Sequence, residues 1–354
     1  MPLAAALLSL LVASQQAPSS PPPPAPPAPV AAASKAMAER AKAFLASLSD
    51  EQRASARRPF DAPERTNWSY VRGNRAGLFL RDMTAAQKAL ALDLMKSGLS
   101  EEGIERVRII RAIEEANGNE EKARNAPITY GEDLYAIFIF GEPSEDPAAA
   151  PWGWRAEGHH IGLHFSSVAG DVTSTPLFFG AFPASLALGA DKGARPLSSL
   201  QEAAFALRRS LSDEQMKRAT VGATCPADVL TGPGREAALK DPATFGGIAM
   251  ADLTQAQRDL LWALVVRHAS DLRGDLASEE LRRIKAAGLE AIRFGFIGEP
   301  ALDKPHYYRV GGPTFVIEFD CTQGNPDHVH CLWNDPARNF GGDVLREHVE
   351  REHR

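Results

Sequence analysis

The chain has 354 residues, of which 44% are hydrophobic and 24% charged, and its formal net charge is -6. These values are typical of an ordinary soluble globular protein, and the length is enough to bury one large core or two ordinary ones. The negative charge provides no electrostatic attraction for nucleic acid or for an anionic membrane. We therefore expect neither as a partner.

The N-terminus differs from the rest of the chain. An apolar run over residues 3–13 is followed by small residues, and the first charged side chain is Lys35. Such a run is typical of a secretory signal, although no Lys or Arg precedes it, and it is too short to span a bilayer. We expect a signal peptide over residues 1–17, a Pro-rich linker over 18–33 and a folded part from about Ser34. The predicted location is periplasmic or secreted.

Three cysteines fit an exported protein with at most one disulfide. Cys321 and Cys331 flank an expected hairpin and could pair across it, which would leave Cys225 over. The alternative is three thiols without a disulfide. Spacing alone does not separate the two.

Four short landmarks occur twice and in the same order. They lie at residues 48–52 and 211–215, 83–87 and 253–257, 140–143 and 297–300, and 154–165 and 308–319. Such repetition indicates an internal duplication. We predict a first half over residues 34–190 and a second over 191–354. The two would pack about a pseudo-two-fold axis as one globular unit.

Each half is predicted to contain helices followed by antiparallel strands, which is typical of an α+β fold. Hydroxyl side chains that can cap a helix precede the expected helices at Ser49, Thr84, Ser212 and Thr254. The remaining expected elements are helices over 100–115 and 278–287, strands over 134–140 and 292–297, and hairpins of 161–168 with 172–179 and of 315–321 with 328–333. No Gly-rich strand-to-helix turn of a nucleotide-binding fold is present.

Histidines gather at two places in a chain that has only nine. His159 and His160 lie in the first half, and His328 and His330 lie in the second. Alternation along a strand places the side chains of His328 and His330 on one face. Neutral imidazole is a good ligand for zinc or copper. We predict one metal site in which His328 and His330 are joined by His159 or His160.

The other histidines have simpler interpretations, and hydrogen-bonded imidazoles on a half-buried strand remain the alternative for the two clusters as well. Adjacent strand residues point to opposite faces, so only one of His159 and His160 is expected to coordinate unless the chain bends at Gly158. We expect a packing role for His164, a helix-surface position for His268, a loop position for His306 and solvated positions for His348 and His353.

Side chains beside the clusters supply further candidates. Glu157 and Asp327 are the candidate catalytic carboxylates, because each precedes a histidine cluster; an ordinary surface or turn role is the alternative. Trp152, Trp154 and Trp333 are candidates for the wall of a pocket. Core packing is the more common role for tryptophan and stays open for all three.

Several of these stretches resemble one known bacterial family, the domain of unknown function 3500. They are the segments PWGWRAEGHH at residues 151–160, TPLFFGAFP at 175–183, HVHCLWNDP at 328–336 and FGGDVLREHVEREH at 340–353. The likeness covers nearly everything after the Pro-rich linker. It implies a shared fold, often in exported proteins, and it supplies no activity.

We therefore expect an exported protein that binds one divalent metal ion, with zinc favoured and copper possible. The favoured function is a metal-dependent hydrolase acting on a small molecule. A non-catalytic metal-binding or small-ligand-binding protein, or a copper-dependent oxidoreductase, is the alternative. A scaffold whose histidines are only hydrogen-bonded is a third hypothesis.

Overall fold

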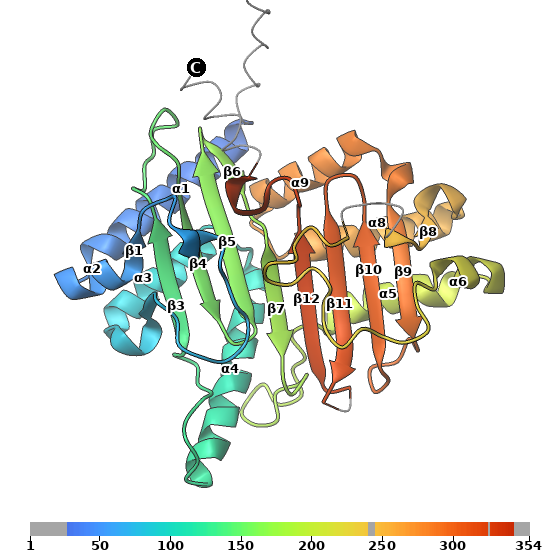
Figure 1. The fold of residues 1–354 in the computed structure, drawn as a ribbon, viewed down its shortest axis with the longest axis horizontal. Coiled ribbons are helices and arrows are strands. Elements are labelled where there is room, and N and C mark those ends of the chain that lie inside the picture. The colour runs from blue at the N-terminus through green and yellow to red at the C-terminus, as the bar shows by residue number, and fades with distance from the viewer. Residues whose placement is uncertain (1–26, 240–244, 325, 343–354) are drawn as a thin grey trace, which may run out of the picture.

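The computed structural model describes residues 27–239, 245–324 and 326–342, which form an α+β fold around one mostly antiparallel sheet (Figure 1). The sheet has 12 strands in the order β1-β3-β4-β5-β7-β12-β11-β10-β9-β8, with β2 beside β3 and β6 beside β5. The strands are β1 (Arg57–Arg58), β2 (Leu78–Phe79), β3 (Tyr135–Phe140), β4 (Trp152–Gly158), β5 (Ile161–Val168), β6 (Asp171–Thr173), β7 (Leu177–Ala181), β8 (Ile248–Ala249), β9 (Arg293–Gly298), β10 (His306–Gly311), β11 (Val316–Gln323) and β12 (His328–Asn334). The predicted α+β class is confirmed.

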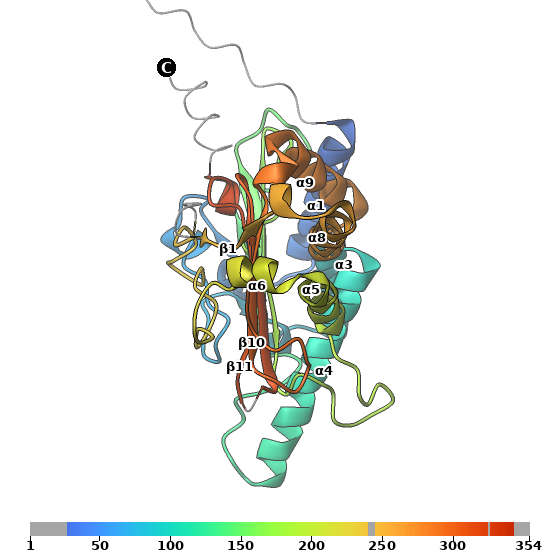
Figure 2. The same cartoon turned by 90° about the vertical axis from the view of Figure 1, so that its right-hand side faces the viewer.

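Helices lie mainly on one face of the sheet, and long irregular segments lie on the other (Figure 2). The helices are α1 (Ala28–Ala46), α2 (Asp50–Ala56), α3 (Ala85–Lys96), α4 (Glu101–Ala123), α5 (Ser198–Ser210), α6 (Asp213–Ala219), α8 (Gln255–Ala269) and α9 (Gly274–Ala287). Among the residues described, none of these helices combines the length and apolarity needed to cross a membrane. The main hydrophobic core lies between the helices and the sheet.

The four predicted helix caps are present. The side chains of Ser49, Thr84, Ser212 and Thr254 each accept a backbone N–H, and a Gln three residues later closes each capping box. These glutamines also pair with one another. The Gln87 amide donates to the Gln52 amide oxygen at 2.8 Å, and the Gln257 amide donates to the Gln215 amide oxygen at 2.8 Å. Helices that start at such caps have their first N–H groups satisfied.

Some elements differ from the sequence-based expectation. Helix α1 begins at Ala28, not near Ser34, because proline is tolerated in the first helical turn and Val30 is buried against the core. Strands β4 and β10 were not predicted, although Trp154-Arg155-Ala156-Glu157 and Tyr308-Arg309-Val310 alternate apolar and charged residues; every residue of both strands is buried. Helix α5 was missed as well. The signal peptide, most of the linker, His348 and His353 lie outside the described residues.

The expected hairpin strand over 172–179 is divided into β6 and β7 around Pro176, which has no N–H to offer a ladder. Strand β7 thereby pairs with β5 on one side and with β12 on the other, and Leu177 faces Trp333 across the second pair. The N-terminal and C-terminal parts of the sheet are joined at β7 and β12. This junction brings the two histidine segments together.

None of the three cysteines forms a disulfide. Strand register places Cys331 opposite Phe319 and Cys321 opposite His306. Cys331 instead contacts His268, with its Sγ 3.4 Å from Nδ1. Of the two alternatives that spacing left open, the structure has the free thiols.

Candidate metal centre

The first histidine pair forms the two-residue turn between β4 and β5, where Gly158 pairs with Ile161. His160 has a positive φ of 66°, an uncommon backbone conformation for a residue other than glycine. Two backbone hydrogen bonds hold it there: its N–H donates to the Tyr70 carbonyl at 3.1 Å, and its carbonyl accepts from the Gly180 N–H at 2.8 Å. The turn is therefore fixed to β7, and the His160 ring is directed along that strand.

The second pair lies on β12, directly beside β7, where His330 faces Gly180. The Nε2 atom of His328 lies 2.8 Å from Nε2 of His160 and 3.0 Å from Nε2 of His330. His160 and His328 are 168 positions apart in the chain, and His330 is two positions after His328. They form a group whose ligand atoms could hold a metal ion.

Gly180 provides the space for this convergence. A Cβ atom at this position would lie 2.6 Å from Cδ2 of His160 and 2.8 Å from Cδ2 of His330. Both distances are shorter than van der Waals contact allows. Any side chain on this residue of β7 would therefore displace at least one of the two rings.

Carboxylates face the far nitrogens of the two buried imidazoles. Nδ1 of His160 lies 3.2 Å from a Glu114 oxygen on α4, and Nδ1 of His330 lies 2.8 Å from Asp228 in the segment after α6. In metal sites, a carboxylate at this position accepts the N–H of the ligand and leaves the opposite nitrogen free to coordinate. When each carboxylate accepts, the N–H of His160 and of His330 lies on Nδ1 and Nε2 carries the lone pair.

Burial favours the neutral imidazole of His160 and of His328. It lowers the pKa of His328 to about 3 and holds the pKa of His160 well below the usual value for histidine. Burial also raises the pKa of Glu114 to about 9. A cation at the three Nε2 atoms would act in the opposite direction on Glu114, because it would favour the charged carboxylate.

The Asp228 carboxylate accepts a hydrogen bond from Tyr70 and lies beside a second acid, Asp320. The Tyr70 hydroxyl donates to Asp228 at 2.8 Å, and Tyr70 stacks on Phe178 with ring centroids 4.1 Å apart. Asp320 is fully buried, its Oδ2 lies 3.7 Å from Nδ1 of His330, and burial raises its pKa to about 6. For Asp228, burial is the largest single cause and raises the pKa, but the hydrogen bonds from His330, Tyr70 and the Val229 N–H, together with the attraction to His330, outweigh it and the pKa is lowered. The charged form of Asp228 is therefore favoured.

His159 lies beside this group without joining its three nitrogens. Its ring stacks on His160 with centroids 3.7 Å apart, and its Nδ1 lies 2.9 Å from the same Glu114 oxygen. Of the adjacent pair, His160 is the residue whose nitrogen meets His328.

The two carboxylates singled out from the sequence have other partners. Glu157 is buried in ion pairs with Arg75 at 3.5 Å and Arg155 at 3.3 Å. Asp327 accepts the backbone N–H of Ala184 at 3.0 Å. Neither belongs to a group of candidate metal-ligand atoms within the described part of the chain.

The tryptophans and the remaining described histidines belong to the interior. Trp152, Trp154 and Trp333 are all buried in the main core. The surface position predicted for His268 is wrong: the residue is buried, and Nε2 lies 3.0 Å from the Tyr308 hydroxyl. The predicted packing role of His164 agrees with its edge-on contact with the Trp68 ring, with ring centroids 5.0 Å apart. His306, expected in a loop, is the first residue of β10 and is fully buried.

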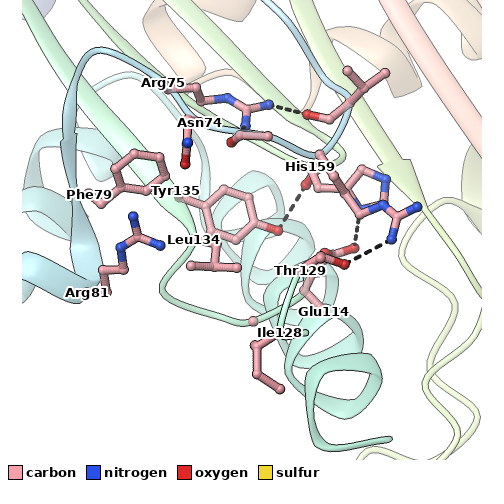
Figure 3. A pocket seen from close by; sticks show the side chains of 14 residues that line it. Asn74, Arg75, Phe79, Arg81, Glu114, Ile128, Thr129, Leu134, Tyr135 and His159 are labelled. Atoms are coloured by element: carbon pink, nitrogen blue, oxygen red, sulfur yellow. Dashed lines mark hydrogen bonds and ion pairs between the residues drawn. The ribbon is translucent and has the colours of Figure 1, made fainter. Parts of the chain in front are cut away.

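A cavity of about 530 Å³ lies on the other side of His159 (Figure 3). Its wall includes Glu114 and His159 from the histidine centre, and Tyr135, whose hydroxyl donates to the His159 carbonyl at 3.0 Å. The remaining lining residues are Val71, Arg72, Gly73, Asn74, Arg75, Phe79, Arg81, Ile128, Thr129, Gly131 and Leu134. Two side chains, His159 and Glu114, thus lie between the cavity and His160.

Reasoning from sequence missed Glu114, Asp228, Tyr70 and Gly180. A pattern for one of them is visible in the chain. The buried residues Val107 and Ile110 fix the inner face of α4, and Glu114 falls on that face, where an apolar residue is expected. A charged residue at a core position indicates a partner inside the protein.

The sequence can now be compared with known proteins. A family model described as protein of unknown function (DUF3500) matches residues 31–342. The chain belongs to this family. The match includes the histidine turn and all of β12, so every residue of the centre lies within the family region. No curated protein and no solved structure matches the chain.

Proposed function

We propose that His160, His328 and His330 bind one divalent metal ion through their Nε2 atoms. The observation that carries this proposal is the convergence of three Nε2 atoms, while the other ring nitrogens of His160 and His330 face carboxylates. When those carboxylates accept the Nδ1 protons, His160 and His330 both present an Nε2 lone pair, and a single N–H on His328 can serve only one of them. A cation among the three nitrogens satisfies them all.

The distances are consistent with this reading. Imidazole nitrogens that each lie about 2 Å from one ion in tetrahedral geometry lie about 3.3 Å from one another. The two Nε2 separations of 2.8 and 3.0 Å are a few tenths of an ångström shorter, so the rings would move apart slightly to hold an ion. Three neutral nitrogen ligands favour zinc, with copper as the second choice. A metal held by three imidazoles keeps an open position, at which it can activate water and polarise a substrate oxygen.

The favoured reaction is hydrolysis of a small-molecule substrate. In this proposal Glu114 and Asp228 are positioning residues that fix the tautomers of His160 and His330. Asp228 is also the better candidate for a general base than Glu157 or Asp327, because its side chain is 33% exposed and lies beside the ligands. The alternative functions are a non-catalytic metal-binding protein and a copper-dependent oxidoreductase.

We also propose that the fold arose by duplication, with halves at 34–190 and 191–354. The two glutamine pairs support it, because they join the same two helix starts in each half and reach matching carbonyls at Ser47 and Ser210. If so, Gln87→Ala and Gln257→Ala each remove the same contacts. Both should lower the free energy of unfolding by about 1–2 kcal/mol in urea denaturation. A large effect in only one half would contradict the duplication.

The apolar run at residues 3–13 supports export of the protein to the periplasm or outside the cell. Export matters for the metal, since an oxidising compartment makes free thiols poor competitors for it. Expression of the full chain followed by cell fractionation tests this proposal. A protein that stays in the cytosol at its full length would contradict it.

Elemental analysis of protein purified without a histidine tag tests the metal proposal. We expect one zinc or copper ion per chain, and we expect its loss in His328→Ala and His330→Ala. His268→Gln is the matched control, because His268 is equally buried but bonds to Tyr308. Full metal content in His328→Ala and His330→Ala would overturn the ligand assignment.

A second measurement distinguishes a catalytic metal site, which has an open position, from a closed site in a non-catalytic metal-binding protein. Cobalt-loaded protein has visible bands that report on coordination, and azide should shift them if a position is open. An unchanged spectrum would favour a closed site and hence a binding protein.

A further inference from the structure

The cavity beside His159 is lined both by exposed apolar side chains and by arginines. Val71 and Ile128 are 59% and 54% exposed, although both are large apolar side chains. Arg72 and Arg81 line the same cavity. Apolar surface next to guanidinium groups matches a ligand that has an apolar body and an anionic end.

The two arginines are available for an anion, whereas a third is not. Arg75 is buried, contacts Glu157 at 3.5 Å and donates to backbone carbonyls at Ser69 and Gly73. Within the described residues, Arg72 makes no ion pair; it donates to the Thr129 hydroxyl at 3.0 Å and stacks over Tyr130. Arg81 lies over the Phe79 ring, and its nearest acid is Asp82 at 3.9 Å.

The shape of the cavity places the anion away from the metal centre. In Figure 3, Arg81, Asn74 and Phe79 lie on one side, while His159 and Glu114 lie on the other, beyond Tyr135. A ligand held by Arg81 would extend past Tyr135 toward the His159 side. A volume of about 530 Å³ suits a molecule of this kind.

We propose that this cavity binds a small organic carboxylate with an apolar body. Guanidinium groups match the geometry of a carboxylate, and Phe79, Ile128 and Leu134 line the wall that would contact the apolar body. Glu114 and His159 face the cavity from the Nδ1 side of His160, so the bound carboxylate lies away from the Nε2 atoms proposed to hold the metal. Binding of the carboxylate therefore does not depend on the metal site.

Octanoate is the probe, with octanamide and inorganic phosphate as matched comparisons, in calorimetric titrations of the full chain. We expect octanoate to bind roughly tenfold or more tightly than octanamide, which lacks the charge, and than phosphate, which lacks the apolar body. Equal binding of octanoate and octanamide, or no binding of octanoate at millimolar concentration, would overturn the proposal.

Single variants assign the contacts. Arg81→Gln is expected to weaken octanoate binding by roughly tenfold, since it loses the charged donor at the anionic end, whereas Arg72→Gln, at the end of the cavity beside Thr129 and Tyr130, is expected to weaken it less. Arg282→Gln is the control: this arginine is exposed on α9 and pairs only with Glu279 in the described structure. Equal loss in all three variants would indicate non-specific attraction and contradict the assignment.

Discussion

The buried histidines of this protein fall into two groups, and the contrast between them locates the centre. His164 and His306 each point Nδ1 at a backbone carbonyl, at 2.7 and 2.8 Å. His160, His328 and His330 point Nε2 at one another. Both groups are shielded from water, so burial alone does not distinguish them.

The difference lies in what satisfies each imidazole. A core histidine needs one donor and one acceptor in the protein, as His268 has between Tyr308 and Cys331. The clustered histidines place nitrogen lone pairs together, an arrangement that is costly unless a cation lies among them. Clustering of acceptors, rather than burial, indicates the metal site.

The largest loss of metal binding is expected when the space that the three imidazoles need is removed. Gly180→Ala should abolish most metal binding, because a Cβ atom would lie 2.6 Å from His160 and 2.8 Å from His330. Gly274→Ala is the control, since its Cβ would meet nothing within 4 Å. Elemental analysis of both proteins after identical purification gives the comparison. Normal metal content in Gly180→Ala would mean that the rings do not have to converge.

A smaller effect is expected from the carboxylates that orient the ligands. Glu114→Gln and Asp228→Asn should each weaken metal binding by roughly 10–100-fold, because the tautomer of the attached imidazole is no longer fixed. Competition with a chelator of known affinity measures the change. Glu157→Gln offers no useful control, because it would leave two buried arginines without a partner.

Asp327→Asn supplies that control instead. Asp327 is next to His328 in sequence, but its Oδ1 accepts the N–H of Ala184. The variant should therefore keep its metal affinity. A loss of metal affinity comparable to that in Asp228→Asn would indicate that Asp327 also acts on the ligands, and it would weaken the role assigned to Asp228.

The smallest effect concerns a core histidine and the stability of the fold. Burial lowers the pKa of His268 to about 3, below the value of about 6.5 in an unfolded chain. The unfolded state therefore takes up the proton first, so the contribution of this residue is complete above pH 6.5 and is lost as the pH falls from 6.5 toward 3.

His268→Gln tests that contribution. Between pH 7 and pH 5 the wild-type protein should lose about 2 kcal/mol of unfolding free energy through this group, and the variant should not. Urea denaturation at the two pH values measures the difference. An identical loss in both proteins would mean that His268 is not held neutral by burial.

Local chemistry was sufficient to predict much of the fold. Hydroxyl residues at N-cap positions predicted four helix starts, and the expected hairpin of residues 315–321 with 328–333 is present as β11 and β12. Strands β4 and β10 were missed, although their apolar and charged residues alternate as in other strands. The start of α1 was misjudged, because prolines before it resembled a linker.

The centre was predictable only in part. The spacing of His328 and His330 placed two imidazoles on one face of a strand, which depends on local geometry alone. The choice of His160 over His159 depends on the positive φ of the turn and on the contact with β7, which no local pattern specifies. Glu114 and Asp228 reach the ligands from distant segments, so only the packed fold brings them there.

The central claim is that three imidazoles share one ion. X-ray absorption spectroscopy of the untagged, zinc-loaded protein tests it most directly. The account predicts three imidazole nitrogens at about 2.0–2.1 Å and no sulfur ligand, with one imidazole fewer or no bound metal in His160→Ala. A zinc shell without imidazole scattering, or one with sulfur at about 2.3 Å, would contradict it.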